Sequence, residues 1–216
     1  MAIISDGNAR WAQARGLTVG EGHEAAADTV IARTHDAAEL GVEQLTVYSF
    51  STENWTRPAE EVNGLISLLG RRIETDTPGL HAAGVRLRFV GRRQTLSAQL
   101  AERMRWAEAM TAHNTRMALF IAFNYGGRAE IVDAARRFGG STEEEFRELL
   151  YAPEMRDPDV MIRTGAEHRL SNYLLWQSAY SELVFREELW PDFTREAFED
   201  SLAEFSERSR RFGGRT

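Results

Sequence analysis

Short apolar segments alternate with longer segments of helical periodicity along the chain, and this alternation limits the folds open to it. The short segments predict strands at residues 2–5, 44–49, 85–90, 117–123, 160–163 and 183–185. The longer segments predict helices at 22–40, 59–75, 95–111, 128–138 and 194–211. Ser141 with Glu144 forms a capping-box pattern that predicts a further short helix. Strands separated by helices pair in parallel, so the sequence predicts an α/β fold with a central, mostly parallel six-stranded sheet flanked by helices.

Composition and charge exclude several classes of protein. The chain carries 33 acidic and 26 basic side chains and a net charge of −7, so we expect no nucleic-acid partner. No apolar run approaches the ~20 residues that span a bilayer, and the apolar opening at residues 1–4 is short for a signal peptide, so a cytoplasmic protein is expected. Cysteine and lysine are absent, which excludes thiolate and Schiff-base chemistry. A phosphate group would therefore be held by arginine, by backbone N–H groups or by a metal ion.

Polar residues cluster directly after four of the predicted strands, in segments 5–11, 50–58, 124–128 and 163–172. In a parallel sheet the ligand site lies beyond the carboxyl ends of the strands, where the loops converge. The four segments are rich in arginine, asparagine, glycine and acidic residues. The sequence thus predicts a polyanion site at that edge of the sheet.

Asp6 is the candidate metal ligand of the first polar segment. It ends a strand just before Gly7 and Asn8, where a helical segment starts, so its carboxylate could hold Mg²⁺ beside a phosphate. Arg10 adds positive charge, and His23 at the start of the next helix could donate to an anion. The structural alternatives are an Asx turn or a helix cap at Asp6 and a capping or surface role for His23.

The segment after the fifth strand combines Arg163, Arg169 and Ser171, with Gly165 giving the backbone freedom to fold around a ligand. Two guanidinium groups and a hydroxyl can together hold several phosphate oxygens. The alternative is a structural network of ion pairs with the nearby acidic residues Asp159, Glu167 and Glu182.

An apolar stripe lies on the predicted helix at 59–75, formed by Val62, Leu65, Ile66, Leu69 and Ile73. Such a stripe normally packs on a sheet. It could also line an apolar tunnel beside the polyanion site, which would suit a substrate with a diphosphate head and a hydrocarbon tail. Periodicity leaves both interpretations open.

Taken in order, the motifs resemble those of one family. The matching segments lie at 4–12, 22–23, 48–58, 124–128, 162–165, 169–172, 174–177, 180–182, 190–193 and 210–214, and so cover nearly the whole chain. They include the sequences SDGNARWA, SFSTENWTRP, NYGGR, IRTG and RLSN. These motifs are similar to those of the cis-prenyltransferases, typified by undecaprenyl diphosphate synthase.

The resemblance implies an undecaprenyl diphosphate synthase-like domain over residues 1–216, with an apolar tunnel, that assembles as a homodimer. It also implies a Mg²⁺-dependent transferase that condenses isopentenyl diphosphate with an allylic diphosphate, such as farnesyl or geranyl diphosphate. The product would be a Z-polyprenyl diphosphate of the undecaprenyl or decaprenyl lipid-carrier type, and peripheral membrane association would allow its release. Such chemistry needs no covalent nucleophile, so it agrees with the absence of cysteine and lysine.

The same resemblance assigns roles residue by residue. Asp6 holds Mg²⁺ with assistance from Glu182, and the allylic diphosphate is bound by Gly7, Asn8, Ala9, Arg10, Trp11 and His23. The isopentenyl diphosphate is bound by Arg163, Arg169 and Ser171. A flexible loop supplies the expected catalytic residues Ser51 and Asn54 and the substrate-binding residues Trp55 and Arg57. Near the C-terminus, Arg211 and Gly213 belong to a motif that reaches the partner subunit's site.

The sequence also departs from the family pattern. Val19 stands where many members carry an arginine that contacts the allylic diphosphate, and the missing polar segment before the first strand suggests a shortened N-terminus. Product length and preferred starter therefore stay open. The alternatives are a short-chain Z-prenyl diphosphate synthase, a non-catalytic partner subunit, and a plain phosphate-binding module, which would have no apolar tunnel.

Overall fold

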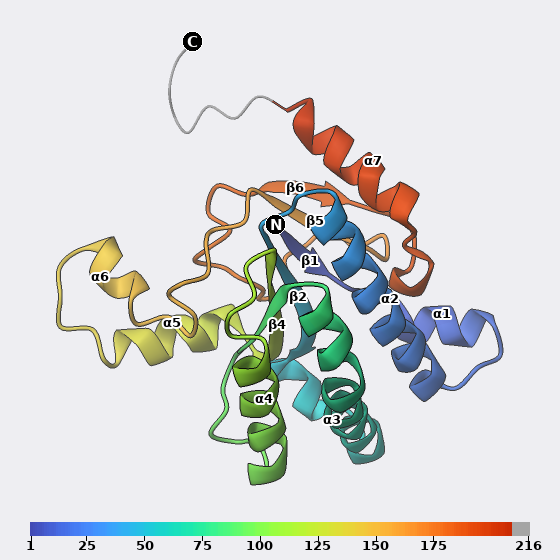
Figure 1. The fold of residues 1–216 in the computed structure, drawn as a ribbon, viewed down its shortest axis with the longest axis horizontal. Coiled ribbons are helices and arrows are strands. Elements are labelled where there is room, and N and C mark those ends of the chain that lie inside the picture. Colours follow the sequence, from blue (N-terminus) through green and yellow to red (C-terminus); the bar gives the residue numbers. More distant parts are fainter. Residues whose placement is uncertain (209–216) are drawn as a thin grey trace.

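A six-stranded sheet forms the centre of the computed structural model, which describes residues 1–208 (Figure 1). The strands are β1 (Ala2–Ile4), β2 (Gln44–Ser51), β3 (Val85–Val90), β4 (Met117–Tyr125), β5 (Val160–Arg163) and β6 (Glu182–Phe185). Their order across the sheet is β3-β4-β2-β1-β5-β6, and every neighbouring pair is parallel. The predicted α/β class and number of strands are confirmed.

Helices connect β1 through β5 in turn, and a further helix follows β6 (Figure 1). They are α1 (Asn8–Ala14), α2 (Val19–Glu39), α3 (Ala59–Ala82), α4 (Ala98–Met110), α5 (Gly127–Ala135), α6 (Glu143–Arg147) and α7 (Arg195–Ser206). Two 3-10 turns, η1 (Thr52–Thr56) and η2 (Trp190–Asp192), follow β2 and β6. Within residues 1–208, no helix is both long enough and apolar enough to cross a membrane.

Side chains along the strands alternate between two apolar clusters, one on each face of the sheet. Ile3 and Val47 belong to the cluster that contains buried side chains of α2, α3, α4 and α7. The next residues along these strands, Ile4 and Tyr48, belong to the other cluster, together with Tyr173 from the segment between β5 and β6. Burial on both faces explains why the strands are almost continuously apolar.

Helix α3 is longer than the sequence predicted. The expected end was Thr75, whereas the helix continues through Pro78 to Ala82. A proline inside a helix costs about 3 kcal/mol because it removes one hydrogen bond and crowds the preceding turn. Thr77 and Leu80 are fully or almost fully buried, and we infer that their packing offsets this cost.

Other helix ends also differ from the prediction: α2 begins at Val19 and not at 22, α4 begins at Ala98 and not at 95, and α5 ends at Ala135 and not at 138. The capping box of α6 is formed by Thr142 and Glu145, one residue later than the predicted Ser141 and Glu144. Both pairs have the spacing of a capping box, so local sequence does not distinguish them. Helix α7 ends at Ser206, and the last part of the predicted helix at 194–211 lies outside the described residues.

Candidate active site

A polar pocket, here called the anion pocket, lies at the carboxyl ends of β1, β2 and β5. This is the edge of the sheet at which the sequence predicted a polyanion site. The sequence-predicted residues that line the pocket are Asp6, Gly7, Asn8, Ala9, Arg10, His23, Ser51, Asn54, Arg57, Arg163 and Ser171. They meet because β2, β1 and β5 are neighbours in the sheet although they are far apart in the sequence.

The carboxylate of Asp6 lies between two guanidinium groups. Its Oδ2 is 2.7 Å from Nη2 of Arg163, and its Oδ1 is 3.6 Å from Nη2 of Arg10. The backbone of Asp6 is fixed separately, since its N–H donates to Oγ1 of Thr164 at 3.0 Å and its carbonyl accepts from the N–H of Trp190 at 2.9 Å. The Asp6 side chain is 32% exposed, so the carboxylate can still meet a ligand that enters from solvent.

Arg163 is a buried arginine whose side chain is only 4% exposed. Its Nη1 donates to Oγ of Ser171 at 2.7 Å and to the backbone carbonyl of Arg169. The loop between them folds back through left-handed backbone, with φ of 87° at Gly165, 48° at Ser171 and 63° at Asn172. Such conformations are costly for residues other than glycine and cluster at ligand sites. Here they place the Ser171 hydroxyl against the guanidinium.

Two polar atoms of the pocket residues, Oδ1 of Asn8 and Nε of Arg163, are buried without a hydrogen-bond partner. A third buried atom, Nε2 of His23, has only a contact of 3.5 Å with Oε1 of Glu61. A buried polar atom that stays unsatisfied costs about 1–3 kcal/mol, and native proteins keep few of them. Their presence around one pocket indicates a polar ligand that would complete their hydrogen bonding.

His23 lies beside an acidic residue that sequence reasoning did not select. Nε2 of His23 is 3.5 Å from Oε1 of Glu61, and the same oxygen accepts from Nη1 of Arg57 at 2.8 Å. Burial lowers the pKa of His23, although Glu61 acts in the opposite direction, so the imidazole is mainly neutral at pH 7 and keeps one N–H. The spacing of Arg57 and Glu61 could have predicted their ion pair, but no local pattern relates either residue to His23.

The η1 turn is held in place at both of its edges. Within it, Oδ1 of Asn54 accepts from the backbone N–H of Ser51 at 3.0 Å. On the side of the Ser171 loop, Nδ2 of Asn172 donates to Oε1 of Glu53 at 2.7 Å. This bond connects the turn that carries Asn54 to the loop that carries Ser171.

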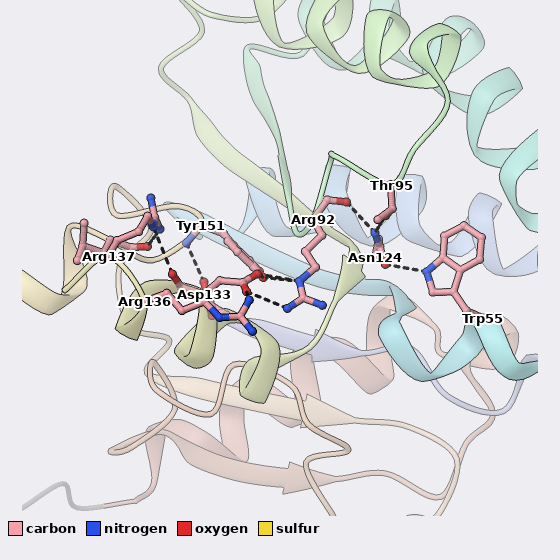
Figure 2. A network of polar contacts seen from close by, with 10 residues as sticks. Trp55, Arg92, Thr95, Asn124, Asp133, Arg136, Arg137 and Tyr151 are labelled. Atoms are coloured by element: carbon pink, nitrogen blue, oxygen red, sulfur yellow. Dashed lines mark hydrogen bonds and ion pairs between the residues drawn. The ribbon is translucent and has the colours of Figure 1, made fainter.

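The other edge of η1 is fixed through a buried asparagine. The indole N–H of Trp55 donates to Oδ1 of Asn124 at 2.7 Å (Figure 2). Nδ2 of Asn124 in turn donates to the backbone carbonyl of Arg92 at 2.7 Å and to Oγ1 of Thr95 at 2.8 Å. Asn124 is 2% exposed and has a positive φ of 51°. Trp55 thus anchors the turn and is not among the residues that line the anion pocket.

Several further predicted residues also lie away from the pocket wall. The indole N–H of Trp11 donates to Oδ1 of Asp192 at 2.7 Å. The side chain of Arg169 is 61% exposed and pairs with Glu167, which is one of the ion pairs that the structural alternative named. Arg211 and Gly213 lie outside the described residues.

Glu182 lies at the amino ends of the parallel strands, whereas Asp6 lies at their carboxyl ends. It begins β6 opposite Val160, which is level with Met1, whereas Asp6 follows the far end of β1. This offset along the strands is roughly 16 Å at the rise of an extended chain. Oε2 of Glu182 accepts from Nη1 of Arg208 at 3.1 Å. The prediction that Asp6 and Glu182 share one metal ion is therefore wrong within a single subunit.

The oxygen donors of the pocket fit Mg²⁺ that binds together with a diphosphate. Within residues 1–208, no group of three or more His, Cys, Asp and Glu side chains could hold a metal ion by itself. Mg²⁺ is commonly held by one or two carboxylates, with water and substrate phosphates as its other ligands. Asp6 supplies such a carboxylate, and the unpartnered Oδ1 of Asn8 supplies a second oxygen in the same wall.

An apolar cavity adjoins the anion pocket between α2, α3 and the sheet. The two spaces share wall residues that include Asn8, His23, Phe50 and Leu65. Beyond them, the wall is formed mainly by apolar side chains, among them Ala26, Val30, Leu68, Leu69, Ile73, Leu119 and Phe123. Of the predicted stripe, Leu65, Leu69 and Ile73 line the cavity, while Val62 and Ile66 pack in the core. Both interpretations of the stripe therefore hold in part.

Comparisons with known proteins agree with this geometry. Residues 4–213 match the family model described as "Putative undecaprenyl diphosphate synthase". The isoprenyl transferase of Thermotoga maritima is 47% identical and is matched over 99% of this chain and 96% of its own length. The ditrans,polycis-undecaprenyl-diphosphate synthase of Salmonella paratyphi A, named as specific for (2E,6E)-farnesyl diphosphate, is 44% identical over 99% of this chain and 89% of its own length.

Among solved structures, the fold is similar to that of lavandulyl diphosphate synthase from Lavandula x intermedia, crystallised in complex with dimethylallyl diphosphate. The TM-score is 0.94 at 32% identity, and the match covers 98% of this chain and 96% of that chain. The sequence match thus extends over nearly the full chain, and the fold agrees with it. The chain is therefore a prenyl transferase that belongs to the undecaprenyl diphosphate synthase family.

Proposed function

We propose that this protein condenses isopentenyl diphosphate with an allylic diphosphate, farnesyl or geranyl diphosphate, and extends it to a Z-polyprenyl diphosphate of the undecaprenyl class. The observation that supports this most directly is the shared wall of the anion pocket and the apolar cavity. A diphosphate bound in the pocket would have its hydrocarbon tail in the cavity. A plain phosphate-binding module has no need of such a cavity.

The pocket offers separate donors for two diphosphates. Arg163 and Ser171, on the β5 side, are proposed to bind isopentenyl diphosphate. Arg10 and His23, on the side of α1 and α2, are proposed to bind the allylic diphosphate. Asp6 contacts Arg163 and lies near Arg10, so it would lie between the two proposed sites.

In the proposed reaction the allylic carbon–oxygen bond breaks and its electron pair leaves with the diphosphate. The allylic carbon bonds to the double bond of isopentenyl diphosphate, and loss of a proton forms the new cis double bond. Mg²⁺, when bound through Asp6, would neutralise charge on the departing diphosphate. Arg10 and Arg163 are already fixed near that charge, so they can stabilise it with little reorganisation. Ser51, at the end of β2, and Asn54, in η1, would position the reacting ends.

The assembly proposed here follows the family resemblance. Residues 1–216 would act as one catalytic domain in a homodimer. Glu182 could assist a metal ion only across such an interface, because it lies far from Asp6 of its own subunit. A cytoplasmic location and peripheral membrane contact during product release stay predictions.

Incubation with labelled isopentenyl diphosphate and separate allylic starters tests the proposed function. Farnesyl and geranyl diphosphate are each supplied with Mg²⁺, and the extracted products are sized. We expect incorporation of several isoprene units that requires both the starter and the metal ion. Products that stop after one or two additions would favour the short-chain alternative, and no incorporation with any starter would contradict the proposed reaction.

Leu69→Trp is expected to shorten the product without preventing the first condensation. Leu69 lines the apolar cavity, so a larger side chain there would fill space that the growing chain needs. Overpacking can also destabilise a domain by ~1–3 kcal/mol, so melting curves accompany product sizing. Ser67→Trp is the matched control, because Ser67 is exposed on the same helix. Unchanged product length in a folded Leu69→Trp protein would show that the growing chain does not pass this residue.

Trp55→Phe is expected to lower kcat about fivefold, because the hydrogen bond to Asn124 is worth roughly 1 kcal/mol and fixes the turn that carries Asn54. Phenylalanine can keep the aromatic contact with Phe50, so we expect little change in melting temperature. Steady-state kinetics measure the effect. Trp106→Phe, at an exposed tryptophan on α4, serves as the control. An unchanged kcat would show that η1 is positioned without the indole bond.

A further inference from the structure

Asn172, which follows Ser171 in the chain, connects its own loop to two other elements. Its backbone carbonyl accepts from the N–H of Gly127 at 2.7 Å, and its Oδ1 accepts from the N–H of Arg128 at 2.8 Å. Its Nδ2 donates to Oε1 of Glu53 on η1 at 2.7 Å. One polar atom of the side chain is therefore bonded to α5 and the other to η1.

The bonds to α5 fix the position of Asn172. The first N–H groups of a helix have no partner within the helix, and here the loop supplies two of the missing acceptors. The loop and the helix approach closely, because a Cβ atom on Gly127 would lie 3.1 Å from the carbonyl oxygen of Asn172. The next residue of the loop, Tyr173, is fully buried and stacks on Tyr48 with ring centroids 4.3 Å apart. Asn172 is thus held in place without its bond to η1.

The bond from Asn172 to η1 is made to an ionised carboxylate. Burial acts to raise the pKa of Glu53, but hydrogen bonds from Asn172 and from donors at the start of η1 lower it below its usual value. Glu53 is therefore charged at pH 7, and a hydrogen bond to a charged group is roughly twice as strong as one between neutral groups. Because Glu53 is exposed, water screens part of this interaction.

The bond between Asn172 and Glu53 joins the two parts of the proposed site. Ser171 precedes Asn172 and accepts from Arg163, on the side proposed for isopentenyl diphosphate. Asn54 follows Glu53 and lines the anion pocket from η1. Neither Asn172 nor Glu53 is among the residues that line the pocket. Their bond can therefore fix Ser171 and Asn54 relative to each other without contact to a substrate.

We propose that Asn172 is a positioning residue that couples the isopentenyl diphosphate side of the anion pocket to η1. The inference rests on the proposed function, because it takes Ser171 as a substrate-binding residue and Asn54 as a catalytic one. Isopentenyl diphosphate that binds at Ser171 would stabilise the loop and, through Asn172, the position of η1. Such coupling acts in both directions, so a correctly placed η1 would in turn favour the loop conformation that binds the substrate.

Asn172→Asp removes the donor and keeps the bonds to α5. The new carboxylate can still accept from the N–H of Arg128, and aspartate tolerates the left-handed backbone at this position, where φ is 63°. Toward Glu53 it repels instead of donating. We expect kcat to fall about tenfold and the KM for isopentenyl diphosphate to change much less, because Ser171 keeps its place. Initial rates with labelled isopentenyl diphosphate and farnesyl diphosphate measure both constants.

A variant that swaps the two groups distinguishes positioning from a general loss of structure. In Asn172→Asp/Glu53→Gln, here called the swapped variant, the amide lies on η1 and the carboxylate on the loop, so the bond can form in the opposite direction. We expect its kcat to lie within about twofold of the parent value. Asn172→Asp/Glu53→Ala has the same net charge but cannot form the bond, so its kcat should stay about tenfold low. Equal kcat values in the two double variants would overturn the proposal.

Asn114→Asp is the matched control for stability. Asn114 is also half-buried, and its Nδ2 donates to the carbonyl of Val85 at 2.7 Å, at the amino end of β3 and away from the anion pocket. Its kcat should stay nearly unchanged, and a fall equal to that of Asn172→Asp would overturn the proposal. If Asn172→Asp does not fold, Glu53→Ala removes the same bond from an exposed position and should lower kcat about fivefold.

Amide hydrogen exchange in residues 51–57 tests the positioning without turnover. In the absence of substrate, exchange should be faster in Asn172→Asp than in the parent and should return to the parent rate in the swapped variant. Isopentenyl diphosphate should slow exchange in the parent and not in Asn172→Asp. Equal exchange in the substrate-free parent and Asn172→Asp would overturn the proposal. A parent that shows the substrate-free differences but catalyses no condensation would contradict the proposed function and would support the role of Asn172.

Discussion

Asp6→Ala is expected to lower the rate of condensation about a thousandfold, the upper range for removal of one electrostatic group from an active site. Among the residues that the structure describes, Asp6 is the one Asp or Glu that lines the anion pocket. Without its carboxylate, the proposed Mg²⁺ would lose its protein anchor beside the departing diphosphate. Turnover at saturating substrates, measured over a range of Mg²⁺ concentrations, tests this expectation.

Two variants control the Asp6 experiment. Asp6→Asn keeps the size of the side chain and removes its charge, so we expect a similar loss of turnover. Asp192→Ala removes a carboxylate that pairs with Arg15 outside the pocket and should leave turnover nearly unchanged. Because Asp6 is 32% exposed, water can replace it at Arg163, and melting temperatures should change little. Near-normal turnover in a folded Asp6→Ala protein would show that Asp6 is not a ligand of the metal ion.

Arg163→Ala is expected to raise the KM for isopentenyl diphosphate about 100-fold and the KM for the allylic substrate much less. Each hydrogen bond to a charged group is worth about 1.5–3 kcal/mol, and a guanidinium can donate two such bonds to a diphosphate. The buried side chain also holds Ser171 in the pocket, so its loss would disturb a second donor on the same side. Initial rates with one substrate varied and the other saturating give both constants.

Two variants control the Arg163 experiment. One changes another arginine of the same loop, and the other is a conservative substitution of Arg163 itself. Arg169→Ala should have a smaller effect, because that side chain faces solvent and pairs with Glu167. Arg163→Lys keeps the charge but loses the fork of donors, so its KM should lie between those of the parent and of Arg163→Ala. Melting curves identify any variant that loses stability. Equal increases in both KM values would contradict the proposed division of the pocket.

The fold was largely predictable because hydrophobic periodicity reports which side chains are buried. The bounds of β3 and β5 agree with the prediction, and β2 and β4 differ only in extending further at their carboxyl ends. Helix ends were less predictable, because they depend on packing as well as on local residues. Pro78 lies inside α3, where buried neighbours extend the helix past it.

The sequence predicted which polar segments form the candidate site. It did not predict which of their side chains contact one another. Strand ends located Asp6 and Arg163, which are 157 positions apart and bond directly. The contact between His23 and Glu61 joins two helices, and the bond from Trp55 to Asn124 joins a turn to a strand end. Such contacts depend on how separate elements pack, and no local sequence pattern encodes that.

The sequence by itself determined the order of strands and helices, the polar segments at the strand ends and the family, because each depends on local periodicity or on motifs in order. The tertiary structure decided the rest. It placed Glu182 far from Asp6, since parallel strands put the start and the end of a strand at opposite edges of the sheet. It also decided that Leu65, Leu69 and Ile73 of the apolar stripe line a cavity, because the packing of α2 against α3 determines which residues of α3 border an open space.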